Sequence, residues 1–288
     1  MIRRPAVAGQ FYPSQPAQLL KEVARCLEGG EREVTVPGGE VTVPGGEVTV
    51  GVERQRVLGV LSPHAGYMYS GKVAGAVYSR IEFPQTFILL GPNHTGMGSP
   101  VSIMSSGRWQ TPIGEIEIDE PLAERLIRHS KAISEDAMAH LMEHSLEVQI
   151  PFILYLSKDV RIVPIVFMID SLDICREIGK ALTDVIKDVG YPVTIVASSD
   201  MSHYETDSVA RSKDRMAIDR ILAIDPDGLY RTVKTHRISM CGYIPAVTML
   251  YAVKGLGAAS ADLVMYATSG DVSGDYDYVV GYAGIIIR

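Results

Sequence analysis

The chain has 288 residues, of which 47% are hydrophobic and 21% are charged, a balance typical of a soluble globular protein. Its formal net charge is −7 and its longest basic run is Arg3-Arg4, so the charge pattern argues against a nucleic-acid-binding protein. The three cysteines, Cys26, Cys175 and Cys241, lie far apart and predict no disulfide framework, which favours a reducing compartment.

The N-terminus and the apolar segments show no sign of export or membrane insertion. Residues 1–5 lack the apolar core of a signal peptide. The longest apolar stretch, residues 162–169, is far short of the roughly 20 residues that span a bilayer. We therefore expect a cytoplasmic protein that contacts neither a membrane nor nucleic acid.

The first part of the chain is predicted to hold a helix and a short repeat. The helix starts near Pro16 and ends at Gly29-Gly30. Residues 33–51 then repeat the sequence Glu-Val-Thr-Val-Pro-Gly-Gly, which is typical of short extended pieces separated by turns. Two and a half copies are too few for a solenoid, which needs at least about 3 repeats. We therefore interpret residues 33–51 as a low-complexity surface excursion of one α/β domain that spans residues 1–288.

From Val57 onwards, predicted strands alternate with predicted helices. Helices of about ten residues or more between strands favour a central, mainly parallel or mixed sheet with helices on both faces. Pro164 lies inside a predicted strand and indicates an edge position or a bulge, and Gly107-Arg108-Trp109 is predicted as a turn. The predicted strands are 57–62, 86–90, 101–104, 113–118, 160–167, 192–197, 262–268 and 279–287, and the predicted helices are 70–81, 121–130, 143–156, 172–189, 207–222 and 242–253, with a further helix opening at Asp225-Pro226.

Three of these strands end in the same way, at a sharp turn that carries a histidine or an aspartate. His64 follows the first strand, His94 follows the second, and Asp200 with His203 follows the strand at residues 192–197. Ligands of open α/β sheets bind beyond the carboxyl ends of the strands, and right-handed crossovers bring these ends to one edge. Because neutral imidazole is the commonest metal ligand, the pattern predicts one metal-capable site. The alternative is that each histidine only forms a hydrogen bond within its turn.

Asp200 and His203 are three residues apart and would share a face if the chain turned helical there. A carboxylate beside an imidazole raises its basicity, so this pair is a candidate general base. The alternative is that Ser199 or Asp200 caps a helix and leaves His203 exposed.

Two further segments carry reactive groups. Cys241 stands at the start of a predicted helix, where the helix N-terminus would lower the pKa of its thiol and favour the thiolate that binds metals. The alternative is a small buried core residue. Glu143 and Glu147 open another predicted helix, where acidic residues suit the helix dipole, and His144 between them is in reach of the site.

Seven motifs in order resemble the Memo family, whose archaeal and bacterial members are named AmmeMemoRadiSam system protein B. Only the repeat at residues 33–51 is interpreted as specific to this chain and not part of the family pattern. The motifs are Arg4–Pro13, Pro63–Tyr67, Gly91–His94, Glu143–Gln149, Ser198–His203, Cys241-Gly242 and Val279–Ala283.

The resemblance implies a fold like that of class III extradiol dioxygenases, which use non-haem iron, together with a metal pocket. It implies that His64, His94 and Cys241 are the metal ligands. It also implies that Asp200 and His203 are the catalytic pair, with His203 as the base. The residues expected to support the ligands or line the pocket are Tyr67, Asn93, Glu143 and His144.

A thiolate in place of the carboxylate of the dioxygenases' facial triad favours copper or zinc as well as iron. We therefore expect one divalent metal ion, iron first, with copper or zinc as alternatives. The principal hypothesis is metal-dependent redox chemistry on an unknown small substrate. One alternative is a non-catalytic module whose pocket binds a small molecule or a peptide, and another is a zinc-dependent hydrolase. The family resemblance also implies a functional link to radical-SAM and AmmeMemo companion proteins.

Overall fold

A computed structural model describes residues 1–31 and 54–288 of the chain. The interpretation of residues 33–51 as a surface excursion lies outside the described residues. Within them, a mixed 12-stranded sheet follows the order β1-β5-β6-β8-β3-β9-β2-β12-β10, with β11, β4 and β7 pairing off this path. The strands are β1 Ile2–Arg3, β2 Gly59–Ser62, β3 Thr86–Pro92, β4 Val101–Ile103, β5 Arg108–Thr111, β6 Gly114–Ile118, β7 Ser134–Glu135, β8 Arg161–Phe167, β9 Val193–Ser198, β10 His203–Glu205, β11 Ala261–Thr268 and β12 Val279–Ile287.

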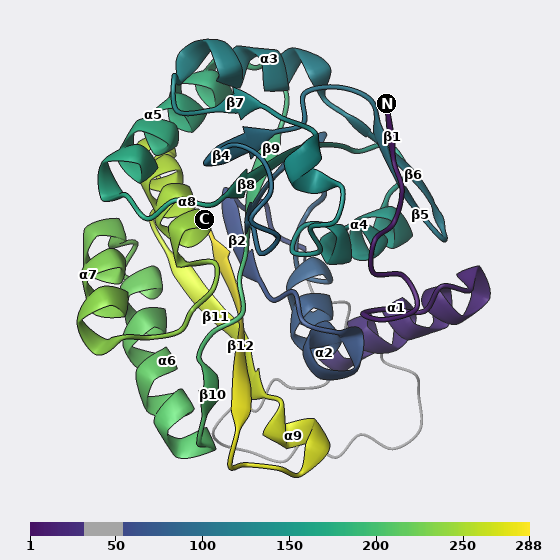
Figure 1. Ribbon diagram of the computed structural model, residues 1–288, viewed down its shortest axis with the longest axis vertical. Helices are drawn as coiled ribbons and strands as arrows, with labels where there is room; N and C mark the ends of the chain where they lie inside the picture. Colours follow the sequence, from purple (N-terminus) through teal and green to yellow (C-terminus); the bar gives the residue numbers. More distant parts are fainter. Residues whose placement is uncertain (32–53) are drawn as a thin grey trace.

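Helices cover both faces of this sheet (Figure 1), which confirms the predicted fold class. Helix α2 packs against β2, β11 and β12, whereas α8 packs against β2, β3 and β9. The helices are α1 Pro16–Glu31, α2 Tyr67–Tyr78, α3 Glu120–His129, α4 Ile150–Leu156, α5 Leu172–Asp188, α6 Asp207–Leu222, α7 Pro226–His236, α8 Tyr243–Leu256 and α9 Gly270–Ser273, with 3-10 turns at Met138–His140 and Glu147–Gln149. None of the described helices combines the length and the apolar character that crossing a membrane requires.

The centre of the sheet consists of four parallel strands, β8, β3, β9 and β2, whose residues are almost all buried. Their near-continuous apolar runs are typical of parallel strands covered on both faces. The register aligns Ile88 of β3 with Val163 of β8 and Ile195 of β9. It also aligns Ser62 at the end of β2 with Ser198 at the end of β9. The turns that follow β2, β3 and β9 therefore meet at one edge of the sheet.

Two local predictions are wrong. Arg108 and Trp109 do not form a turn but begin β5, where Trp109 is buried and pairs with Ile116 of β6. Pro164 lies in the interior of the sheet without a bulge. It sits between the residues of β8 that pair with β6, which end at Ile162, and those that pair with β4, which start at Ile165.

The helix predicted over residues 143–156 begins only at Ile150, after the 3-10 turn at Glu147–Gln149. The interpretation of Glu143 and Glu147 as residues favoured by a helix dipole is therefore wrong. Both carboxylates are buried and bound to specific partners instead.

Candidate metal centre

Three imidazoles meet beyond the carboxyl ends of the central strands. His64 follows β2, His94 follows β3, and His144 comes from the loop before the 3-10 turn at Glu147–Gln149. One potential ligand atom from each of the three lies within 4.8 Å of the other two. The ring centroids of His94 and His144 are 4.7 Å apart, and those of His64 and His94 are 5.3 Å apart. His64 is buried, His144 is half-buried and His94 is exposed, so the cluster opens towards solvent on one side.

The tautomer of His64 follows from its neighbours. The Ser198 hydroxyl donates its proton to the Ser145 carbonyl at 2.6 Å and accepts from the Gln149 amide at 2.9 Å. Ser198 Oγ therefore acts as the acceptor for His64 Nδ1, which lies 3.0 Å away. Burial, together with the neighbouring His94 and His144, lowers the pKa of His64. The ring is thus neutral and keeps a free lone pair on Nε2, which is the form that binds metals.

Glu143 holds the other two imidazoles. Its Oε1 lies 2.9 Å from His94 Nδ1 and 3.4 Å from His144 Nδ1, and it accepts from the Ser145 amide at 2.8 Å. Burial alone would raise the pKa of this carboxyl, but the hydrogen bonds from His94 and Ser145 outweigh it and bring the pKa to about 2. A carboxylate that fixes ligand imidazoles in this way is typical of metal sites.

Cys241 lies beside the imidazole cluster. Its Sγ is 3.2 Å from His64 Nε2 and accepts from the Asp200 amide at 3.3 Å. The predicted lowering of its thiol pKa is wrong, because burial and then the charge of Asp200 raise the pKa of Cys241. Without a metal the thiol therefore keeps its proton, and both His64 Nε2 at 3.2 Å and the Asp200 carbonyl at 3.7 Å are in reach as acceptors. In the group of three possible ligands that lie within 4.8 Å of one another, His144 stands where the family resemblance implies Cys241.

Asp200 and His203 both line the same pocket, although the chain does not turn helical between them. His203 Nδ1 lies 2.9 Å from the Met201 carbonyl and 3.0 Å from the Ser239 carbonyl, so it must be a donor. In the neutral imidazole, Nε2 is then the nitrogen that carries the lone pair. Asp200 accepts from the backbone amide of His64 at 2.8 Å. Two carbonyls thus orient the candidate base, and Asp200 positions His64.

The pocket in front of these groups has a volume of about 690 Å³. One phenylalanine and four tyrosines line it beside polar residues, and among them Tyr204 and Tyr278 are 79% and 73% exposed. No lysine or arginine is among the described residues that line it. The aromatic wall residues are Phe11, Tyr69, Tyr204, Tyr278 and Tyr282.

The remaining predicted residues lie behind the pocket. The Tyr67 hydroxyl donates to the Val148 carbonyl at 2.6 Å. The Asn93 side chain stabilises the turn after β3, because it accepts from the Thr95 amide at 3.0 Å and donates to the Met97 carbonyl at 2.7 Å. Both residues therefore shape the elements that carry the imidazoles.

Sequence reasoning missed a buried ion pair behind the cluster. The Arg3 guanidinium pairs with Glu147 and donates to the Glu143 carbonyl at 2.7 Å and to the His140 carbonyl at 3.0 Å. Glu147 also accepts from the Ala6 amide at 2.7 Å. The chain terminus thereby fixes the loop that carries His144. Arg3 directly precedes the motif Arg4–Pro13, and Glu147 lies within the motif Glu143–Gln149. Neither motif indicates that the two residues pair.

Comparisons with known proteins agree with these features. A family model described as Memo-like protein matches residues 3–286. A MEMO1 family protein of Methanothermobacter thermautotrophicus is 44% identical over 286 residues, which cover 98% of this chain and 99% of the relative. A MEMO1 family protein of Methanopyrus kandleri is 42% identical over 292 residues, which cover 100% of this chain and 99% of the relative.

Among solved structures, an uncharacterized protein from Escherichia coli K12 is similar, with a TM-score of 0.57. The match covers 80% of this chain and 100% of that one at 14% sequence identity, so it concerns the fold alone. The family, by contrast, is shown over the whole length of both compared chains. On this ground the chain belongs to the Memo family.

Proposed function

We propose that this protein binds one divalent metal ion at His64 and His94 and carries out redox chemistry on a small substrate in the adjoining pocket. The observation that carries the proposal is the group of three imidazoles whose ligand atoms lie within 4.8 Å of one another. Its second support is the hydrogen bonding at Nδ1, by which Ser198 and Glu143 leave the Nε2 atoms of His64 and His94 available.

The third ligand is His144 or Cys241. His144 belongs to the compact group, whereas Cys241 Sγ contacts His64 Nε2 at 3.2 Å. Imidazole ligands suit iron, copper and zinc, and a thiolate shifts the preference towards copper and zinc. A bound iron or copper ion would supply the exchange of electrons with the substrate. Metal binding would have to displace the proton of Cys241 if this thiol is the third ligand.

Within the pocket, His203 is placed to take a proton from the substrate through Nε2, because Nδ1 is held by the Met201 and Ser239 carbonyls. Asp200 accepts a hydrogen bond from the backbone amide of His64, and this contact keeps its carboxylate close to the imidazoles. Asp200 and Asp275 in the lining favour a small substrate without a large negative charge, and the tyrosine rings offer it apolar contacts.

Metal analysis of anaerobically purified protein tests the proposal. We expect close to one equivalent of iron or copper in the wild type, and less than about a tenth of that in His64→Gln and His94→Gln. His236→Gln is the matched control, because His236 is exposed and does not line the pocket. Comparing His144→Gln with Cys241→Ser identifies the third ligand. Wild-type protein that carries no metal and takes up none in titration would overturn the proposal.

The redox step has its own test. Oxygen consumption in the presence of candidate reductants should require the metal and should fall in His203→Gln while metal content stays unchanged. Retention of both oxygen consumption and metal in Cys241→Ser would exclude the thiol as a ligand and leave the three imidazoles.

A second candidate function is zinc-dependent hydrolysis. The observation that favours it is the set of three imidazoles beside an open cavity, since three protein ligands and one open position are typical of catalytic zinc. A hydrolase would be restored by Zn²⁺ alone after chelation and would not respond to oxygen. A pocket that only binds a ligand or peptide would keep its affinity after chelation.

A further inference from the structure

A second cavity lies at the opposite end of the central strands. It has a volume of about 570 Å³, within the range of small-molecule sites. Val57 and Leu58 reach it just before β2, Phe83 just before β3, and Tyr191 just before β9. The carboxyl ends of the same strands carry the imidazoles, so the two cavities are separated by the length of the sheet.

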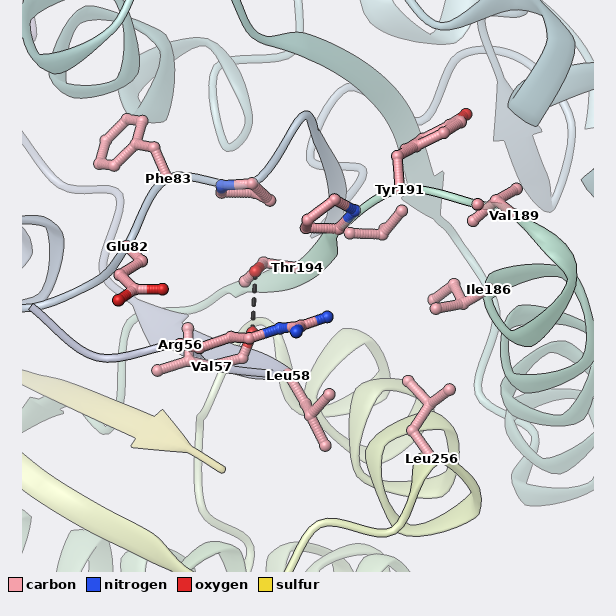
Figure 2. A pocket seen from close by; sticks show the side chains of 14 residues that line it. Arg56, Val57, Leu58, Glu82, Phe83, Ile186, Val189, Tyr191, Thr194 and Leu256 are labelled. Atoms are coloured by element: carbon pink, nitrogen blue, oxygen red, sulfur yellow. Dashed lines mark hydrogen bonds between the residues drawn. The ribbon is translucent and has the colours of Figure 1, made fainter.

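The walls of this cavity are largely apolar. Leu58, Phe83, Ile186 and Val189 are only partly buried and pack against the hydrophobic core from the cavity side. Leu256 at the end of α8 closes the wall next to α5, as Figure 2 shows. Partly exposed aliphatic side chains around a concavity are the surface that the apolar body of a ligand covers.

The two hydroxyl groups of the lining already have a partner within the protein. The Thr194 hydroxyl donates to the Val57 carbonyl at 2.9 Å. The Tyr191 hydroxyl donates to Asp119 at 2.8 Å and presents its ring to the cavity. Neither hydroxyl therefore requires a ligand as its hydrogen-bond acceptor. The charged side chains of the lining decide which ligand the cavity recognises.

Arg56 is the cation of this cavity. Figure 2 shows its guanidinium extending into the cavity between Leu58 and Thr194, away from the carboxylate of Glu82. Within residues 1–31 and 54–288, the Arg56 guanidinium has neither an ion pair nor a hydrogen bond. By contrast, most of the other arginines in this part of the chain contact a carboxylate or an aromatic ring.

We propose that this cavity binds a small amphipathic carboxylate, whose anionic head pairs with Arg56 and whose apolar body covers Leu58, Ile186, Val189 and Leu256. A planar guanidinium matches a carboxylate with two parallel hydrogen bonds. The apolar walls supply the remaining affinity, since each buried methylene contributes to binding. The site is independent of the metal centre, and its test requires no metal.

Calorimetric titration with octanoate, octan-1-ol and octylammonium tests the proposal. We expect octanoate to bind one site with a dissociation constant of about 1 mM and octan-1-ol to bind at least about tenfold more weakly. Arg56→Gln should weaken octanoate about tenfold and leave octan-1-ol unchanged. Arg54→Gln is the matched control, because Arg54 is an exposed arginine two residues away that does not line the cavity.

Methyl NMR of the chelated protein locates the ligand. Octanoate should shift the methyl signals of Leu58, Ile186, Val189 and Leu256. The proposal is overturned if octanoate binds no better than octan-1-ol, if octylammonium binds more tightly, if Arg56→Gln keeps full affinity, or if the shifted signals come from the histidine pocket. Since Arg56 is exposed and has no partner within residues 1–31 and 54–288, the Arg56→Gln variant should fold like the wild type. Methyl signals outside the cavity that keep their wild-type positions verify this.

Discussion

The two ends of the central sheet differ in how their polar groups are satisfied. At the carboxyl end, the buried side chains of His64, Ser198 and Glu143 all have hydrogen-bond partners within the site. At the amino end, Arg56 extends over apolar walls and has no partner in the part of the chain that the structure describes. The carboxyl end is therefore fixed by the protein itself, which suits a metal ion with strict geometry. At the amino end, the positive charge of the Arg56 guanidinium can be neutralised by a ligand.

Removing one partner of the buried ion pair at the carboxyl end should have the largest effect on stability. Arg3→Met leaves Glu147 buried without its cation, and we expect the free energy of unfolding to fall by about 3–5 kcal/mol. Urea unfolding measures the loss. The control is Arg108→Gln, which removes an exposed ion pair with Glu115 and should cost less than about 1 kcal/mol. Equal losses in the two variants would contradict the rigid carboxyl end.

The same region should make stability depend on pH through His140. Burial lowers the pKa of His140 from 6.5 to about 4 in the folded protein. The unfolded chain therefore binds a proton that the folded chain does not, and stability falls as the pH falls through this range. We expect His140 to account for a loss of about 3 kcal/mol between pH 7 and pH 4.

Denaturant unfolding of the His140→Gln variant at both pH values measures this contribution. The variant should lose less stability between pH 7 and pH 4 than the wild type does. His129→Gln, which removes an exposed histidine, should retain the wild-type pH dependence. A pH dependence that is unchanged in His140→Gln would show that the folded protein protonates His140 easily.

The hydrogen bonds behind the imidazoles should set metal affinity. Glu143→Gln keeps the size of the side chain but removes the charge that holds His94, and we expect a 10–100-fold weaker metal complex, by the usual effect of such partners. Competition with a chromogenic chelator measures the affinity. Glu115→Gln on the surface should change nothing. Wild-type affinity in Glu143→Gln would mean that His94 is not a ligand.

The amino end should show the smallest effect on stability. Because Arg56 has no partner among the described residues, Arg56→Gln should change the free energy of unfolding by no more than about 0.5 kcal/mol. Urea unfolding beside Arg3→Met makes the comparison direct. A loss above 1 kcal/mol would mean that Arg56 already has a structural role.

Much of the fold could be predicted because strand and helix patterns follow local periodicity. The helix predicted at residues 207–222 has the same bounds in the structure, and the turns carrying His64 and His94 meet as the crossover rule predicts. The helix predicted from Glu143 failed because tertiary contacts override local propensity. There the hydrogen bonds that the buried Glu143 accepts from the His94 and Ser145 amides hold the chain in an irregular loop.

The details of the site depended on contacts between distant segments. Nothing near Arg3 in the sequence indicates that it binds a loop more than a hundred residues away. The protonation of Cys241 could not be predicted from its place before α8 either, since burial outweighs the effect of the helix end. The assignments of the metal ion, the substrate and the companion proteins stay predictions.

Anomalous diffraction from crystals soaked with a single metal tests the central claim most directly. We predict one strong peak within about 2.0–2.3 Å of a nitrogen of both His64 and His94, with His144 or Cys241 completing the set. At saturating metal, a peak elsewhere, or no peak beside these two histidines, would contradict the metal centre.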